Sequence, residues 1–369
     1  MILAIASVAL ILIILVDGFE ALVYPRRVAH RFRLARVYYR SAWAFWTTVF
    51  RREKYMAVFG PLSLIGLLVI WAMGMILAFG LLHLALEIPV HRISGDGPAT
   101  LLTYLYMSGS TFFTLGLGDV TPLSTLGKIL VVTEAGVGFG FLAMVIGYLP
   151  VLYNHFSSRE ISISLLDARA GSPPSAAEFL KRLARKRKLA DIDRYLEEWE
   201  CWAAQLLESH ISFPVLAYYR SQHDNQSWLA ALTFMLDTSA LVLAAVETPH
   251  RHHARLTFAA ARHAVVDMAL IFRIPPHEGA PRFTAEGWTR LERELREAGV
   301  ELRPAEAAEA KFADLRLAYE PFVGSLARYF GLRLPEIMLA TPGVDNWQTS
   351  AWTRRLAGIY DLAPGDHFE

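Results

Sequence analysis

The chain has 369 residues and a mass of 41.3 kDa, and 54% of it is hydrophobic, with a mean hydropathy of +0.32. Ordinary soluble domains are roughly 45–50% apolar, so membrane insertion is the first possibility to test. Residues 1–160 carry a net charge of +4 and residues 161–369 one of −3, which argues against a uniformly basic nucleic-acid binder. The single cysteine, Cys201, excludes an intrachain disulfide and a thiolate metal cluster.

Three segments have the length and composition of membrane spans. Residues 1–24 begin with sixteen uncharged residues and predict a retained transmembrane helix. A cleaved signal peptide is the alternative, but it needs a basic start and a small-residue cleavage site. Pro61–Leu86 holds 26 residues without Asp, Glu, Lys or Arg, and as a helix it reaches ~39 Å, enough to cross a ~30 Å hydrocarbon core. Ile129–Tyr153 is the third span, and Glu134 is its only charged residue.

The loop between the first two spans, residues 25–56, is strongly basic. From Arg26 to Lys54 it carries nine Lys or Arg against one acid, Glu53, so the positive-inside rule places it in the cytoplasm. The N-terminus is then outside, and the chain after the third span is cytoplasmic, in a multi-pass protein of the cell membrane. Apolar residues of the loop recur at helical spacing beside a strip of arginines. This spacing predicts an amphipathic helix in the loop. The helix either lies on anionic lipid or packs on the soluble domain.

A shorter apolar element lies between the second and third spans. Gly97-Pro98 is a good helix start, and the element runs to Phe112. Fifteen residues reach only ~22 Å as a helix, so the segment must re-enter the membrane rather than cross it. It is followed by Thr114-Leu115-Gly116-Leu117-Gly118-Asp119. In this position the string resembles the pore loop of the potassium-channel superfamily, whose filter commonly reads Thr-Val-Gly-Tyr-Gly-Asp.

The resemblance implies a filter in which backbone carbonyls replace the water shell of the conducted ion, K+. Gly116 and Gly118 tolerate the conformations that point successive carbonyls the same way, and Thr114 adds its hydroxyl. One loop per chain implies a homotetramer, because the carbonyl ring needs four copies. No cofactor or other metal is expected. The expected ion-binding residues are Thr114, Leu115, Gly116, Leu117, Gly118 and Asp119.

Two positions depart from the common pattern of the family. Leu117 stands where tyrosine or phenylalanine is usual, which leaves strict selectivity for potassium over sodium open. Ser110 lies where some members place a glutamate that braces the filter, so another group must brace it here. Glu134 is either a functional intramembrane charge or a neutral acid hydrogen-bonded to the pore helix, for example at Ser108 or Ser110. Ser110 and Glu134 are therefore the predicted filter supports.

The third span contains the candidate gate. Its glycines are either close-packing positions or hinges, and the resemblance places Gly138 where the inner helix of the family bends. Pro150 removes a backbone hydrogen bond and can kink the lower part of the helix. Gly138, Gly147 and Pro150 are the predicted gating residues. No predicted span carries regularly spaced arginines, so the sequence does not encode a voltage sensor of the usual kind.

The C-terminal half is predicted to be helical after a linker over residues 157–175, in which residues 161–167 form an extended or amphipathic connector. Lys181–Lys188 is predicted on a solvated or membrane-facing helix. Trp228–Val246 is predicted as a buried core helix rather than a fourth span. The candidate metal ligands are Glu247, His250, His252, His253, His263 and Asp267. Di-iron sites need two Glu-x-x-His motifs, and this segment has only one, formed by Glu247 and His250. A solvated turn with core histidines is therefore favoured over a metal site.

The sequence thus predicts an all-α membrane protein with a pore domain over residues 57–156, an extra N-terminal membrane helix and a helical cytoplasmic domain over residues 176–369. The expected function is a potassium-selective tetrameric channel, gated by inner-helix bending that is coupled to the cytoplasmic domain. Neither enzymatic activity nor a nucleic-acid partner is expected. The alternatives are a weakly selective cation channel and a non-conducting membrane-tethered sensor.

Overall fold

The computed structural model describes residues 1–23, 34–50, 52–93, 98–171, 173–185, 189–222, 226–248 and 251–339. These residues are almost entirely helical, which confirms the predicted fold class. They divide into two compact units, Met1–Asn154 and His155–Glu369.

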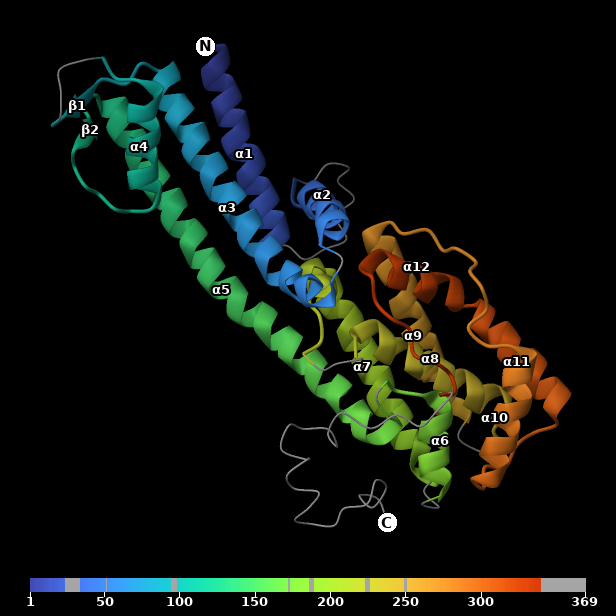
Figure 1. Ribbon diagram of the computed structural model, residues 1–369. Helices are drawn as coiled ribbons and strands as arrows, with labels where there is room; N and C mark the ends of the chain where they lie inside the picture. Colours follow the sequence, from blue (N-terminus) through green and yellow to red (C-terminus); the bar gives the residue numbers. More distant parts are fainter. Residues whose placement is uncertain are drawn as a thin grey trace, which may run out of the picture. The chain divides into compact units, whose positions relative to one another are not determined.

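The first unit contains the membrane helices and the pore loop (Figure 1). The last of its helices, α5, continues into the second unit. In chain order its described elements are α1 (Ile2–Leu22), α2 (Leu34–Val49), α3 (Glu53–Ala85), β1 (Val90–Arg92), α4 (Leu101–Phe112), β2 (Val120–Pro122) and α5 (Thr125–Ala170).

Three helices in the described residues are long and apolar enough to cross a membrane, namely Ile2–Leu22, Lys54–Ala85 and Thr125–Leu166. They confirm the three predicted spans. The structure differs after the third, because α5, which has 46 residues in all, includes residues 157–170 of the stretch that was predicted as a linker and a connector. Serines give that stretch the composition of a loop, but one side of the helix buries Phe156, Ile163 and Leu166. A helix of this length reaches ~69 Å, about twice a hydrocarbon core, so part of it extends beyond the membrane.

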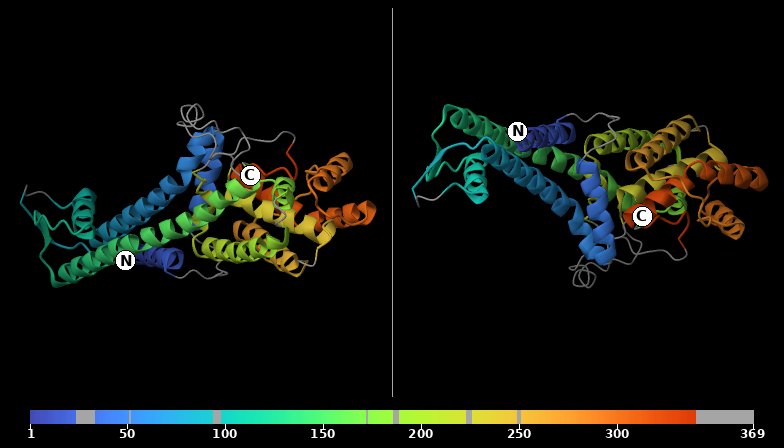
Figure 2. Two further views of the ribbon diagram at one scale, coloured as in Figure 1. Left: turned by 90° about the horizontal axis from the view of Figure 1, so that it is seen from below. Right: turned by 90° about the horizontal axis from the view of Figure 1, so that it is seen from above.

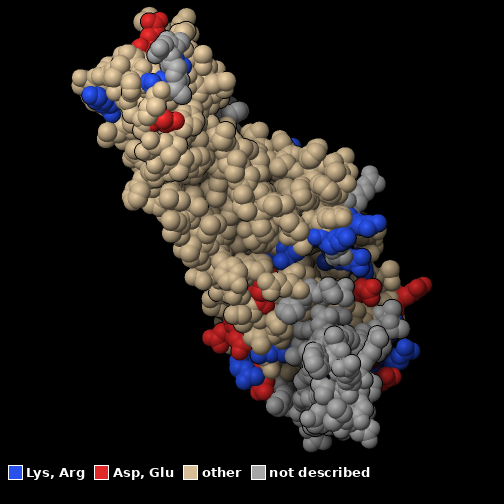
Figure 3. Space-filling model, turned by 60° about the vertical axis from the view of Figure 1, so that its left-hand side comes forward, with Lys and Arg blue, Asp and Glu red and all other residues tan. Residues whose placement is uncertain are grey.

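Glycines on α3 let neighbouring helices approach closely. A Cβ on Gly74 would lie 2.7 Å from the side chain of Ile14 on α1, and a Cβ on Gly80 would lie 2.7 Å from that of Leu105 on α4. Large apolar side chains on the same helices point outward instead, as in proteins that pack small residues together and face lipid with large ones. Figure 3 shows a long face of this unit without a charged residue.

Helix α2 packs on α1 and α3, a placement that the sequence did not predict. The ring of Trp43 lies 4.8 Å from that of Phe59 on α3. The buried carboxylate of Asp17 on α1 accepts from the backbone N–H of Ala35 (3.1 Å) and from Nε1 of Trp71 on α3 (3.0 Å). Asp17 therefore caps α2 and joins α1 to α3. The basic residues of the loop from 24 to 33 lie outside the described residues.

A short antiparallel ladder, also not predicted, pairs β1 with β2 and places His91 opposite Thr121. It is extended by hydrogen bonds from Ile93 N to the Asp119 carbonyl (3.0 Å) and from Leu123 N to the Pro89 carbonyl (2.8 Å). The ladder ties the chain after α3 to the chain after the filter. Figures 1 and 2 show this ladder and α4 at one end of the unit, and Figure 1 shows the N-terminus of α1 at that end too.

The second unit is a helical bundle around α8, whose seventeen residues are all buried. This burial confirms that Trp228–Val246 forms a core helix, because a lipid-facing helix would expose one side. Helices α7 and α9 pack against each other, and α9 also packs on α8. The described helices are α6 (Ala176–Arg185), α7 (Ile192–Ser212), α8 (Trp228–Ala244), α9 (Arg251–Phe272), α10 (Ala285–Glu297), α11 (Ala305–Leu317) and α12 (Glu320–Phe330), with 3-10 turns η1 (Leu189–Asp191) and η2 (Pro214–Tyr218).

The basic run in α6 is not on a solvated or membrane-facing helix, so that prediction is wrong for its described part. Phe179 and Leu180 are buried in the bundle, and Lys181 Nζ lies 3.0 Å from a carboxylate oxygen of Glu294 on α10. The apolar side of α6 decides its position, and its lysine reaches a partner on the neighbouring helix. Residues 186–188 lie outside the described residues.

The candidate metal ligands contact other groups. Glu247 pairs with Arg303 at 3.0 Å, His253 lies 3.2 Å from Asp193, and His263 lies 3.4 Å from Asp267. His250 lies outside the described residues, and within those residues no three His, Cys, Asp or Glu side chains group as a metal site would require.

Candidate pore loop and its support

The pore helix α4 begins three residues later than predicted. Its N-cap is Thr100 rather than the residue before Pro98, and Thr100 N donates to Thr103 Oγ1 at 3.2 Å. Threonine is a good N-cap because its side chain satisfies backbone N–H groups that the first turn leaves free. The helix therefore has twelve residues, too few to cross a membrane, as the re-entrant prediction requires.

The filter begins inside the cap that ends α4. Leu115 N donates to the Ser110 carbonyl (2.8 Å) and Thr114 N to the Thr111 carbonyl (2.9 Å). These two bonds, with Thr114 at φ +55°, are a Schellman motif, in which the left-handed position is usually glycine. Ser110 thus contacts the filter through its backbone carbonyl. The first filter amides are fixed by the pore helix itself.

Positive φ angles alternate along the filter. Thr114, Gly116 and Gly118 have φ values of +55°, +61° and +77°, and the intervening Leu115 and Leu117 do not have positive φ. A positive φ is rare for a β-branched residue and costs roughly 1–3 kcal/mol, so at Thr114 it points to a functional constraint. A carbonyl-lined filter needs successive carbonyls on one side, and positive φ at alternate residues is a backbone conformation suited to that arrangement.

The filter residues are exposed in the single chain. The side chains of Leu115 and Leu117 are 63% and 61% exposed, although both are large and apolar. Exposed apolar residues of this kind mark a surface that lipid or another protein covers.

The Asp119 end of the filter has a support that the sequence analysis missed. Tyr106 on α4 donates its hydroxyl to a carboxylate oxygen of Asp119 at 2.8 Å, while the Asp119 carbonyl accepts from Ile93 N. Asp119 is thus held from two directions, by the pore helix and by the end of the ladder. Tyr106 and Asp119 are thirteen residues apart, and no pattern in the sequence pairs them. The pairing becomes visible only once the position of α4 beside the filter is known.

Behind the pore helix, three wholly buried side chains meet. Glu134 on α5 accepts from or donates to the Ser108 hydroxyl on α4 through one carboxyl oxygen, and its other oxygen lies 3.4 Å from Nε2 of His83 on α3. Ser108 Oγ also lies 2.9 Å from the Ile76 carbonyl on α3. The contact with Ser108 is the alternative that the sequence analysis had named for Glu134. His83 was missed, because nothing in a run of apolar residues indicates which helix a single histidine will face.

The candidate gating residues lie in different surroundings. A Cβ on Gly138 would overlap the backbone carbonyl of Phe112 at the end of α4, so Gly138 is a close-packing position. Around Gly147 no heavy atom lies within 4 Å of such a Cβ. Helix α5 runs through Pro150, which leaves the Ile146 carbonyl without its usual helical donor. The role of these residues in a gate stays a prediction.

In the second unit, a buried ion pair fastens α5. Arg159 Nη1 donates to the Leu216 carbonyl (2.8 Å) and Nη2 to the Tyr219 carbonyl (2.9 Å), while its Nε contacts Glu160 (3.0 Å). Glu160 also accepts from Gln222 N (3.3 Å). Both side chains are buried, so this part of α5 is fixed to the segment around η2.

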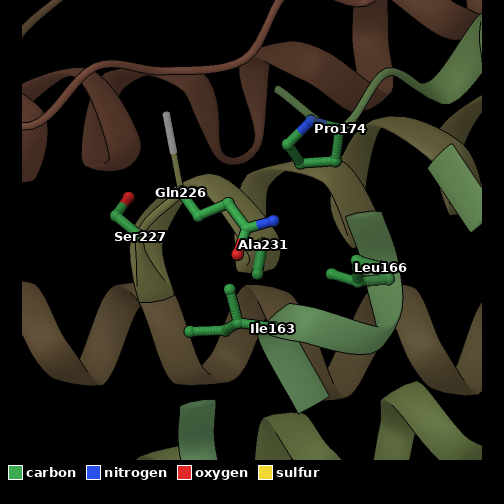
Figure 4. A pocket seen from close by; sticks show the side chains of 6 residues that line it. All are labelled: Ile163, Leu166, Pro174, Gln226, Ser227 and Ala231. Carbon is green, nitrogen blue, oxygen red and sulfur yellow. The ribbon is translucent and has the colours of Figure 1, made fainter. Parts of the chain in front are cut away.

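One turn further along, α5 lies against the start of α8. Figure 4 shows Ile163 pointing toward Ala231 of α8 across a recess of about 180 Å³. The recess has no room for a water-sized molecule, so it indicates packing between helices rather than a ligand site. Its lining residues are Ile163, Leu166, Pro174, Gln226, Ser227 and Ala231.

Comparison with known proteins identifies the pore region. Residues 65–152 match the model of a family described as "Ion channel". This region of the chain is therefore similar to that family. The match begins in α3 and ends in α5, so it contains the pore helix, the filter and the buried residues behind them.

Three curated relatives extend the comparison. The uncharacterized membrane protein YdjJ of Bacillus subtilis (strain 168) is 27% identical over 179 residues, which cover 48% of this chain and 51% of that protein. Protein LctB of Bacillus caldotenax is 32% identical, and protein LctB of Geobacillus stearothermophilus 30% identical, each over 87 residues that cover 21% of this chain and 64% of LctB. The matched regions thus span between about half and two thirds of these relatives. No solved structure matches the chain.

Proposed function

We propose that the chain forms a potassium-selective channel of four identical subunits, with the backbone carbonyls from Thr114 to Leu117 as the ion ligands. The observation that carries the proposal is the alternation of positive φ along the filter, which no helix or strand would produce. Aligned carbonyls of four chains can replace the hydration shell of a cation at membrane depth. Irregular backbone is stable at that depth only where it is buried in protein or lines a water-filled path.

The tetramer is supported by the surface of the single chain. The filter side chains are exposed, and so are large apolar residues along the pore side of α5, such as Phe139 and Ile146. A closed ring of four subunits would cover the filter and place one loop from each chain at the axis.

Gating is proposed to act through α5. The helix joins the filter region to residues 155–170, which the buried pair Arg159 and Glu160 fastens within the second unit. A rearrangement of the helical bundle would therefore move the end of the inner helix. Pro150 and Gly147 lie on the path between, where the helix lacks one hydrogen bond and has free space.

The proposed orientation places the filter end outside and the C-terminal bundle in the cytoplasm. It rests on the nine Lys and Arg between residues 26 and 54 and on the common end shared by the α1 N-terminus and the filter. The basic loop would then meet the anionic lipids of the inner leaflet.

The test is potassium and sodium flux into liposomes that contain the purified full-length chain. Wild type is expected to take up potassium in strong preference to sodium. Gly116→Ala should abolish the flux while the tetramer persists, because an alanine at φ +61° strains the filter and rotates its carbonyls. Gly18→Ala is the matched control, since a Cβ at Gly18 in α1 meets no atom within 4 Å.

A weakly selective cation channel is the second candidate, and Leu117 is the observation that favours it. Leucine cannot supply the hydroxyl with which tyrosine at this position would bond to the surrounding shell. Equal uptake of sodium and potassium by wild type would establish this candidate and overturn selectivity. Undiminished flux in Gly116→Ala would show that ions pass elsewhere.

A further inference from the structure

Behind the filter, the buried side chains of His83, Glu134 and Ser108 offer more hydrogen-bond acceptors than donor hydrogens. This imbalance decides which of them carry protons. His83, Glu134 and Ser108 are fully buried, and the Nδ1 of His83 has no hydrogen-bond partner among the described residues. A protonated Nδ1 would be a buried donor without an acceptor, which costs more than an unused lone pair. His83 is therefore neutral, with its proton on Nε2, directed at Glu134.

The serine decides the state of the carboxyl group. Ser108 has one hydroxyl proton but two acceptors within reach, the Ile76 carbonyl at 2.9 Å and a carboxyl oxygen of Glu134. If Glu134 is protonated, it donates to Ser108 and Ser108 donates to Ile76, so each contact has one proton. If Glu134 is ionised, its charge lies in the membrane beside a neutral histidine, which is costly.

We infer that Glu134 is a resident neutral acid in a closed relay, in which His83 donates to Glu134, Glu134 to Ser108 and Ser108 to the Ile76 carbonyl. The relay begins and ends on α3 and passes through α5 and α4, so it joins the three helices around the pore loop. Ser108 lies two residues before Ser110, whose carbonyl accepts from the backbone N–H of Leu115 in the filter. Glu134 is thus a positioning residue for the filter, and this part of the inference rests on the proposed function.

Other ionisable groups of the surrounding elements are engaged elsewhere. Tyr104 on α4 donates to the Ile88 carbonyl at 2.8 Å, and Asp119 after the filter accepts from Tyr106. His83 from α3 and Ser108 from α4 are the groups that face Glu134. The positions of the protons in the relay are therefore decided by the side chains of His83, Glu134 and Ser108.

Substitution with glutamine tests the inference, since its amide copies the shape and the donor of a protonated acid. Glu134→Gln should keep the wild-type ratio of potassium to sodium flux. At pH 8, folding of the wild-type chain must add a proton to the Glu134 carboxyl, which costs free energy that the variant does not lose. The melting temperature of Glu134→Gln should therefore lie above that of wild type at pH 8, and the difference should shrink toward pH 5. Ser108→Ala interrupts the relay and should lower both the flux ratio and the melting temperature. Ser63→Ala is the matched control, because it also removes a buried hydroxyl group. The Ser63 hydroxyl lies on α3 and donates to the Gly60 carbonyl of the same helix.

Infrared spectroscopy supplies a readout that does not depend on conduction. Wild type in the membrane should show a carboxylic-acid carbonyl band that is absent from Glu134→Gln. The relay would be overturned if Glu134→Gln melted far below wild type at every pH and the spectra of the two proteins showed the same carboxylic-acid band. That result would establish an ion pair between the Glu134 carboxylate and the His83 imidazolium. If wild type conducts no ions, the proposed function fails, while the melting curves and the band still decide the inference.

Discussion

The two units of the chain use buried polar groups in opposite ways. In the first unit, large apolar side chains face outward, glycines fill the helix contacts, and buried acids such as Asp17 and Glu134 join helices through hydrogen bonds. In the second unit, the apolar side chains are inside, and fully charged pairs such as Asp237 with Arg282 are buried among them. The second unit thus pairs its buried acid with a guanidinium, whereas the buried acids of the first unit contact backbone N–H, indole and hydroxyl groups of neighbouring helices.

Removing one member of a buried pair in the second unit should have the largest effect. Arg282 Nη2 lies 2.6 Å from Asp237, and Arg282 also contacts Glu320 at 3.2 Å. Arg282→Met leaves the Asp237 carboxylate buried without its guanidinium, so the free energy of unfolding should fall by about 3–5 kcal/mol. Chemical denaturation of the full-length chain in detergent measures it. Arg296→Met, which removes an exposed pair with Glu292, should cost less than about 1 kcal/mol.

The same variant should also show a characteristic dependence on pH. Burial raises the pKa of the Asp237 carboxyl, and the Arg282 guanidinium opposes that rise. Without Arg282 the carboxyl titrates at a still higher pH, and a raised pKa in the folded state means that stability is lost as pH rises. The deficit of Arg282→Met relative to wild type should therefore be smaller at pH 5 than at pH 8. An equal deficit at both would contradict a buried charge as its cause.

In the first unit, steric packing should produce the largest effect. Gly138→Ala places a methyl group against the Phe112 carbonyl, and backbone cannot move aside as a side chain can. The expected loss is about 1–3 kcal/mol or more, together with loss of ion flux, because the clash displaces the end of the pore helix. Gly140→Ala, on the open side of the same helix, is the control for a general effect of glycine in α5. Thermal stability and liposome flux of both variants test the contrast.

A buried histidine makes the second unit sensitive to acid. Burial, helped by the charge of Arg159, lowers the pKa of His210 to about 3. Its ordinary value is 6.5, so the unfolded chain binds the proton first, and stability that is complete above that value is lost as pH falls. The loss should reach about 2 kcal/mol at pH 5. His210→Phe should remove most of this acid sensitivity, and unfolding curves at pH 7 and 5 would show whether it does.

The smallest predicted change concerns the junction of the membrane helices. Asp17→Asn keeps the size of the side chain but weakens the cap on α2 and the bond from Trp71. The expected loss is about 1 kcal/mol, typical of a helix cap. Glu20→Gln, on the same helix, is the comparison. Thermal melting of the two variants would show whether Asp17 has the greater effect.

Much of the pore region could be predicted from the sequence, because its signals are local. The length and composition of the three spans, the short helix between them and the Gly-x-Gly-Asp string are each written in consecutive residues. Residues 157–170 were mistaken for a linker because the serines of a polar stretch look like a loop, while the buried side of the helix is visible only once α8 and η2 lie beside it. The start of α4 was placed too early because Pro98 suits a first helical turn, whereas Thr100 provides the cap.

Three features of this chain can be read directly from its residues: three segments are long and apolar enough to span a membrane, a short helix precedes a glycine-containing loop, and Trp228–Ala244 is apolar enough to be buried. Hydrophobic length and backbone freedom are properties of segments, so they can be read without a fold. The packing of the helices was needed to learn that His83 contacts Glu134, that Tyr106 donates to Asp119 and that Gly138 packs against the end of α4. Such contacts join residues many positions apart, and their partners depend on which helices lie side by side.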